Sequence, residues 1–140
     1  MNPVFICFAI ALVFSCIPSA PRYVETNSSE SKSYVVYEDR SFSQNNQVWI
    51  PVLVLKNIQE SEQYAIAREL HINYPTVSFE LYSKESLLQK MCSYHQKKID
   101  FPTKEYDLFF LGIINKMFNK DSDELKWMFI STKYKAIELE

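Results

Sequence analysis

The chain has 140 residues, of which 47% are hydrophobic and 23% are charged, with a formal net charge of −2 at pH 7. This composition is typical of a globular protein that is long enough for one domain with a sizeable core. The slight negative charge supplies no cationic field, so it argues against a nucleic acid partner. Gly112 is the single glycine, which excludes the glycine-rich loops that bind phosphate groups.

Residues 1–19 are interpreted as a secretory signal peptide. Val4 to Ile17 is an apolar block without a charged residue, too short to cross a bilayer of about 30 Å as a helix. Small residues follow this block, and the favoured cut is after Ser19. Two alternatives stay open because the start of the chain lacks Lys and Arg: a retained anchor, and a lipid-modified Cys16. Export predicts a secreted, extracellular protein without stable membrane insertion once the signal is removed.

Cysteine usage follows from this interpretation. Once the signal peptide is removed, Cys92 is the only cysteine in the chain. An intrachain disulfide is then impossible, which excludes the small disulfide-stapled scaffolds. A single thiol in an oxidising compartment is either buried or paired with another chain, so a homodimer linked through Cys92 is an open alternative.

Residues 20–33 are polar and rich in serine, and they predict a flexible N-terminal arm. Asn27 begins an Asn-Ser-Ser tripeptide, which makes it a candidate glycosylation site of a secreted glycoprotein. Residues 34–140 contain no linker and no internal repeat, so we expect a single α/β domain there.

The first predicted elements are strands. The β-branched and aromatic residues of Tyr34–Phe42 predict a half-exposed edge strand. Asn45 and Asn46 predict a hairpin turn into the next strand. Val48–Leu55 is apolar in both alternating sets, which is typical of a strand covered by helices on both faces. Pro51 cannot donate to a ladder, so regular pairing is expected to begin near Val52.

A helix and a second strand follow. Asn57 is expected to cap a helix that ends before Pro75, with Glu60 completing a capping box. Residues at helical spacing predict its buried face: Gln63, Ile66, Ala67, Leu70 and Tyr74. Val77, Phe79 and Leu81 then alternate with polar or aromatic residues as a strand.

Ser83 is the expected N-cap of a second helix over Lys84–Lys97. The apolar stripe of this helix consists of Leu87, Leu88, Met91, Cys92, His95 and Ile99. Residues 106–118 fit a strand or a helix, and their length favours a strand over Asp107–Ile114. A polar turn through Asn119–Asp123 and a closing strand to about Lys135 are expected next, with a short helix capped by Asp121 as the alternative to this last strand.

These elements give the order β-β-α-β-α-β-β, an α/β fold with a mixed sheet of about four or five strands and two main helices. The topology is loosely similar to that of a thioredoxin-type domain. A redox thioredoxin would carry Cys-x-x-Cys near residues 57–61, and the chain has none. The similarity therefore implies no activity.

Cys92 and His95 are the only weak catalytic candidates. They lie three residues apart on one predicted helix face, where an imidazole can activate a thiolate. The alternative is that both face the core, where a free cysteine behaves as a small hydrophobic residue.

No metal or cofactor site is predicted. Cys92, His95 and His71 fall short of a four-ligand zinc site. Asn119, Asp121 and Asp123 have the spacing that opens a calcium loop, but Glu124 occupies the position that requires glycine. This segment is interpreted as a solvated turn.

The sequence therefore favours a secreted, non-catalytic protein that acts by binding another macromolecule outside the cell or in the secretory lumen. Aromatic residues make up 15% of the chain, and exposed aromatic side chains are enriched where proteins bind one another. The alternative is a hydrolase or transferase that uses Cys92 and His95.

Overall fold

The computed structural model describes residues 32–119 and 121–139. The predicted signal peptide, residues 20–31 of the predicted arm and Asn27 lie outside the described residues. Ser33 lies inside them, and its carbonyl oxygen accepts a hydrogen bond from the Leu55 amide at 2.7 Å.

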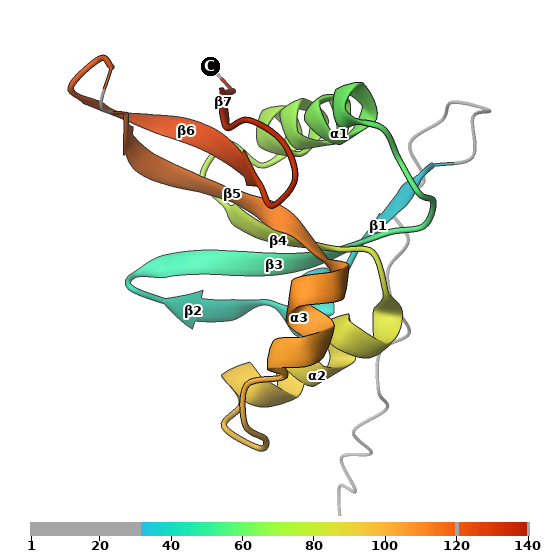
Figure 1. Cartoon of the computed structure of the whole chain (residues 1–140). Helices are drawn as coiled ribbons and strands as arrows, with labels where there is room; N and C mark the ends of the chain where they lie inside the picture. Colours follow the sequence, from blue (N-terminus) through green and yellow to red (C-terminus); the bar gives the residue numbers. More distant parts are fainter. Residues whose placement is uncertain (1–31, 120, 140) are drawn as a thin grey trace, which may run out of the picture.

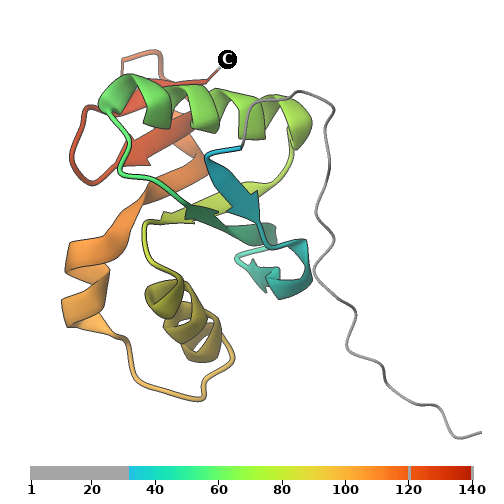
Figure 2. The ribbon, with the colours of Figure 1, turned by 90° about the vertical axis from the view of Figure 1, so that its right-hand side faces the viewer.

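These described residues form an α/β domain built on one mixed sheet of seven strands, in the order β1-β3-β4-β5-β6-β7 with β2 also pairing with β3. The strands are β1 (Tyr34–Val36), β2 (Phe42–Gln44), β3 (Gln47–Val54), β4 (Ser78–Tyr82), β5 (Phe110–Asn119), β6 (Glu124–Ser131) and β7 (Ile137–Glu138). The helices are α1 (Glu60–Asn73), α2 (Glu85–His95) and α3 (Thr103–Phe109). Helix α1 covers one face of the sheet, and α2 and α3 lie on the other side (Figures 1 and 2).

The predicted α/β class is confirmed, but the finer expectations are wrong. The described part of the chain has seven strands and three helices where about four or five strands and two helices were expected, and the thioredoxin-like order is not matched exactly. The additional strands are short: β2 has three residues and β7 has two. Such segments are held by pairing with a neighbouring strand rather than by their own propensity.

The predicted edge strand over Tyr34–Phe42 is divided into β1 and β2, which both pair antiparallel with β3. Between them the chain leaves the sheet as a 3₁₀ turn at Glu38–Arg40. The division lies opposite Pro51, whose carbonyl oxygen accepts from the Tyr37 amide at 3.0 Å. Because Pro51 has no amide hydrogen to donate on that side, the pairing with β3 is interrupted there. The strand β3 itself begins at Gln47 and not near Val52, where regular pairing was expected to begin.

The predicted hairpin turn is confirmed. Asn45 and Asn46 have φ values of 53° and 59°, the left-handed conformation that a two-residue type I′ turn requires at both positions. Asparagine tolerates this conformation better than most residues, which explains how a chain with so little glycine forms the turn.

The strand–helix–strand unit is also confirmed, since β3 and β4 are parallel and α1 connects them. The buried residues of α1 are those expected apart from Tyr74: Gln63, Ile66, Ala67 and Leu70. The predicted cap was two residues too early. Gln59 is the N-cap: its backbone is extended, and its amide donates to Glu62 Oε2 at 2.8 Å.

Both faces of β3 are buried from Ile50 to Val54, as predicted, whereas Val48 and Leu55 at the ends of the predicted stretch are exposed. Val52 and Val54 belong to a core formed with α1, whereas Leu53 belongs to a second core formed with α2. The second core contains Leu53, Tyr82, Leu87, Leu88, Met91 and Phe110.

Helix α2 is shorter than predicted. It ends at His95, and Lys97 has a φ of 58°, which terminates the helical path. The predicted N-cap is wrong, because the Ser83 hydroxyl donates to the Phe109 carbonyl oxygen at 2.9 Å instead of capping α2. This bond fixes the end of β4 against the end of α3.

The ambiguous segment contains a helix followed by a strand. Residues 107–109 end α3, and β5 runs on from Phe110 to Asn119, beyond the predicted limit at Ile114. The closing strand was predicted to reach about Lys135, but β6 ends at Ser131, and residues Thr132–Lys135 are not part of a strand. The alternative helix capped by Asp121 does not form, since Glu124 begins β6.

Candidate functional site

Cys92 and His95 both lie on α2, but the imidazole of His95 has a different polar partner. His95 Nε2 lies 3.2 Å from Glu80 Oε2 of β4. The same carboxylate oxygen accepts the hydroxyl hydrogen of Tyr82. The Glu80 and His95 side chains are each only 13% exposed. The structure therefore builds a carboxylate–imidazole pair where a thiol–imidazole pair was the candidate.

The environment of Cys92 disfavours a thiolate. The side chain is half-buried, and burial is the largest cause that raises the pKa of its thiol. Arg40 opposes this shift, while Glu80 and Asp39 add to it. A protonated, half-buried thiol is a weak nucleophile, so the geometry favours the alternative in which Cys92 serves packing.

Glu80 was missed by the sequence analysis. Its signal is the alternation in β4, which places Ser78, Glu80 and Tyr82 on the face opposite to Phe79 and Leu81. The stripe of α2 packs on that same face, so a carboxylate there would meet His95. This alternation predicts a contact between Glu80 and His95 only when α1 and α2 are assigned to opposite faces of the sheet.

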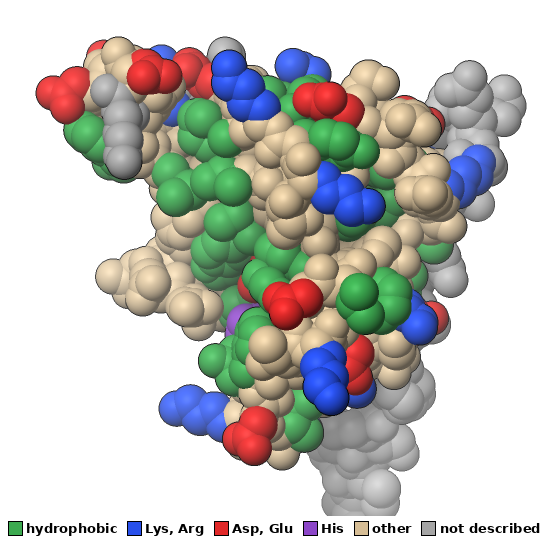
Figure 3. Space-filling model, in the orientation of Figure 1, with side chains coloured by type: hydrophobic (Ala, Val, Ile, Leu, Met, Phe, Trp, Pro, Cys, Tyr) green, Lys and Arg blue, Asp and Glu red, His purple; other side chains and the backbone are tan. Residues whose placement is uncertain are grey.

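The His95 ring also closes one side of a surface hollow. It stacks on Phe42 of β2, with ring centroids 3.7 Å apart and planes 18° apart. The hollow has a volume of about 490 Å³ and lies between β2 and the end of α2; it is lined by Phe42, Ser43, Gln44, Tyr94, His95, Lys97, Ile99 and Asp100. Figure 3 shows this recess below the projecting β2–β3 hairpin, with hydrophobic side chains on its walls.

One edge of the hollow is a strand edge. Among the described residues, β2 pairs only with β3. In a two-residue hairpin the pair next to the turn, here Gln44 and Gln47, exchanges hydrogen bonds, and the following pair does not. Ser43, which stands opposite Val48, therefore directs its backbone amide and carbonyl away from β3, on the side of the hollow.

The third metal candidate lies elsewhere. The His71 ring packs against Trp127 with centroids 5.1 Å apart, on the α1 side of the sheet. It is thus separated by the sheet from Cys92 and His95. In residues 32–119 and 121–139, no three His, Cys, Asp or Glu side chains are grouped so as to hold a metal ion.

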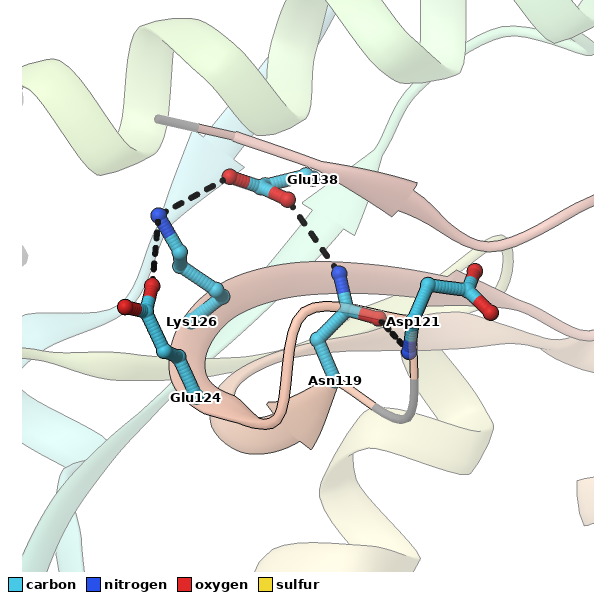
Figure 4. Close-up of polar contacts among 5 residues, drawn as sticks. All are labelled: Asn119, Asp121, Glu124, Lys126 and Glu138. Atoms are coloured by element: carbon cyan, nitrogen blue, oxygen red, sulfur yellow. Dashed lines mark hydrogen bonds and ion pairs between the residues drawn. The ribbon is translucent and has the colours of Figure 1, made fainter.

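The calcium-like segment forms the turn between β5 and β6 (Figure 4). Asn119 donates from Nδ2 to Glu138 Oε2 at 3.2 Å and accepts the Asp121 amide on Oδ1 at 3.0 Å. Both the amide nitrogen and the amide oxygen of the Asn119 side chain thus form hydrogen bonds within the protein. Figure 4 shows the Asp121 carboxylate pointing away from this network.

Comparison of the chain with protein-family models, with curated proteins and with solved structures finds no match. In the described part of the chain, no helix is long and apolar enough to span a membrane. The function is therefore argued from the geometry of the hollow itself.

Proposed function

We propose that the protein is a secreted, non-catalytic protein that binds another macromolecule, and that it does so in the hollow between β2 and α2. The proposed occupant is an extended segment of a partner protein. It adds to the edge of β2 as a further strand and places its side chains against Phe42, Tyr94 and Ile99. The observation that carries the proposal is the outer edge of β2, which runs along one side of the hollow and pairs with no strand of residues 32–119 and 121–139.

The geometry supports this mode in two ways. Strand addition provides main-chain hydrogen bonds to the partner, and a neighbouring hollow provides specificity for alternate side chains. The volume of about 490 Å³ lies within the range of sites that hold small ligands or a few side chains. The aromatic walls are of the kind that anchors peptides.

The test uses the outward-facing amide of Ser43. Replacing Ser43→Pro removes this donor but no bond of the β2–β3 ladder, and proline is tolerated on edge strands when its nitrogen faces outward. Ser43→Ala is the matched control, because it removes the hydroxyl and keeps the amide. The probe is a library of random linear peptides displayed on phage, selected against the exported, purified chain.

We expect selected peptides to bind the wild type and the Ser43→Ala variant equally, and the Ser43→Pro variant about fivefold more weakly, since one hydrogen bond contributes about 1 kcal/mol. Thermal unfolding of both variants checks that the fold is intact. Equal binding by Ser43→Pro would exclude strand addition. Failure to select any peptide whose binding depends on Tyr94 would exclude the hollow as the site.

A second candidate is a hydrolase or transferase that uses Cys92 and His95. The observation in its favour is the Glu80–His95 pair at the hollow, because an imidazole oriented by a carboxylate can act as a general base. The test is turnover of activated esters and thioesters by the wild type and by Cys92→Ala and His95→Gln variants. Turnover that both substitutions abolish would establish this candidate, and turnover that neither changes would remove it.

A further inference from the structure

On the side of β4 away from β2, residues 116–119 of β5 and 124–126 of β6 form a projecting ribbon. β4 pairs with β5 only as far as Phe79 opposite Ile114, whereas β5 and β6 remain paired to Asn119 opposite Glu124. Figure 1 shows this ribbon extending beyond β4. A two-stranded ribbon is marginally stable in water by itself, so the contacts on each of its two faces must account for its stability.

One face of the ribbon is held by a polar network. Lys126 Nζ lies 3.6 Å from Glu124 Oε2 and 3.4 Å from Glu138 Oε1. Glu138 also accepts from Asn119 at 3.2 Å, and its hydrogen bond is the largest cause that raises the pKa of Lys126. The polar side chains drawn on this face of the ribbon thus have their partners within the chain (Figure 4).

The other face is apolar and exposed. Phe118 and Leu125 stand directly opposite each other on neighbouring strands, and they are 58% and 61% exposed. Ile72, at the end of α1, is 75% exposed and follows His71, whose ring packs on Trp127 of β6. Large apolar side chains that gather at one end of a molecule mark an interaction surface.

Charges of opposite sign lie at the two ends of this apolar face. Lys116 precedes Phe118 by two residues, so alternation places it on the same face, toward the base of the ribbon. At the tip, Asp121 and Asp123 are both acidic and exposed, whereas Glu124 belongs to the polar network of the other face. Figure 3 shows acidic and hydrophobic side chains together at this tip.

We infer that the apolar face of the ribbon binds a second copy of the chain, with the two ribbons antiparallel about a twofold axis. In that arrangement Phe118 and Leu125 of one copy cover the same pair of the other. Lys116 of each copy then faces Asp121 and Asp123 of its partner. A surface that is positive at one end and negative at the other complements itself only when it is reversed, which is the geometry of a twofold interface.

The test measures the oligomeric state of the exported, purified chain by sedimentation velocity from about 1 to about 200 µM, a range that covers micromolar dissociation constants. The chain carries Cys92→Ala, so that no disulfide can form. We expect a concentration-dependent dimer that weakens as salt is raised. Phe118→Ser with Leu125→Ser is expected to give a monomer, whereas Leu108→Ser, which changes a leucine of α3 that is 71% exposed, leaves the dimer unchanged.

Charge reversal distinguishes this arrangement from others. Lys116→Glu alone, and Asp121→Lys with Asp123→Lys alone, each place like charges opposite one another in both halves of the interface, and each is expected to be monomeric. Mixing these two variants restores opposite charges in both halves, so a mixed dimer should form. Far-ultraviolet circular dichroism and thermal unfolding confirm that each variant is folded.

A chain that is monomeric over the whole range would overturn the inference. So would a dimer that persists in the Phe118→Ser, Leu125→Ser variant, or a dimer found only when Cys92 is present and oxidised. Failure of the mixed charge variants to associate would exclude the antiparallel arrangement. None of these results bears on peptide binding at β2, which is measured separately.

Discussion

At the scale of single residues, the half-buried polar groups decide what the α2 face of the sheet can do. Glu80 receives the hydroxyl hydrogen of Tyr82 and approaches His95. An imidazole held between a carboxylate and the ring of Phe42 positions the end of α2 against β2. The Glu80–His95 pair therefore fixes one wall of the hollow, and this structural role does not depend on any catalytic role of the imidazole.

Alkylation of Cys92 measures how accessible the thiol is. Since burial raises the pKa of Cys92, we expect iodoacetamide at pH 7.5 to react with the folded chain at least about tenfold more slowly than with the chain in urea. The rate is followed by the mass of the adduct over time. A folded-state rate equal to the rate in urea would mean that the thiol is open to solvent and would revive the catalytic alternative.

At the scale of elements, close backbone approach explains the single glycine. Gly112 of β5 has a φ of 155°, and a Cβ atom there would lie 2.3 Å from the Ile130 backbone oxygen. The pairing of β4 with β5 shifts register beside it, between Leu81 and Tyr82. The irregularity lets β5 continue directly from α3 into the sheet.

Gly112→Ala is therefore expected to destabilise the fold by at least about 2 kcal/mol, because the added methyl group must push two strands apart. Lys104→Ala, at an exposed position of α3, is the control and should change the free energy of unfolding by less than about 0.5 kcal/mol. Urea unfolding followed by tryptophan fluorescence measures both. An unchanged midpoint for Gly112→Ala would show that the strands separate easily at this position.

At the scale of the whole molecule, several tyrosines are anchored at the two cores. Burial is the largest cause that raises the pKa values of Tyr34, Tyr74, Tyr82 and Tyr106. The values for Tyr74 and Tyr106 rise to about 12. The folded protein thus keeps these phenols neutral at pH values where the unfolded chain begins to ionise.

The sign of the resulting pH dependence follows from linkage. A tyrosine in the unfolded chain ionises near pH 10, so the stabilisation is complete below that pH and is lost as the pH rises towards the folded values. Each tyrosine that stays neutral in the folded protein and ionises near pH 10 in the unfolded chain lowers the free energy of unfolding at pH 11 by about 1.4 kcal/mol. We expect a lower urea midpoint at pH 11 than at pH 8, and a smaller difference for Tyr82→Phe. A midpoint that does not fall by pH 11 would contradict the burial of these phenols.

Local patterns in the sequence were sufficient for some elements. The alternation of Val48–Leu55, the helical spacing of Gln63–Leu70 and the Asn45-Asn46 turn each depend on neighbouring residues, so β3, α1 and the first hairpin could be predicted. The burial of both faces of β3 over Ile50–Val54 followed from the same pattern, although Val48 and Leu55 are exposed. These features established the α/β class.

Only the tertiary structure decided the rest, because the deciding contacts join distant residues. Pro51 divides the first strand through a bond to Tyr37, and Phe110 changes from helix to strand where it enters the second core. Glu80 meets His95 only because α2 folds onto β4. The hollow depends on β2 lying beside the end of α2, and the exposed face of the ribbon depends on β4 ending short of β5. Periodicity shows which residues share a face, but the packing of elements determines which of those faces stays open to a partner.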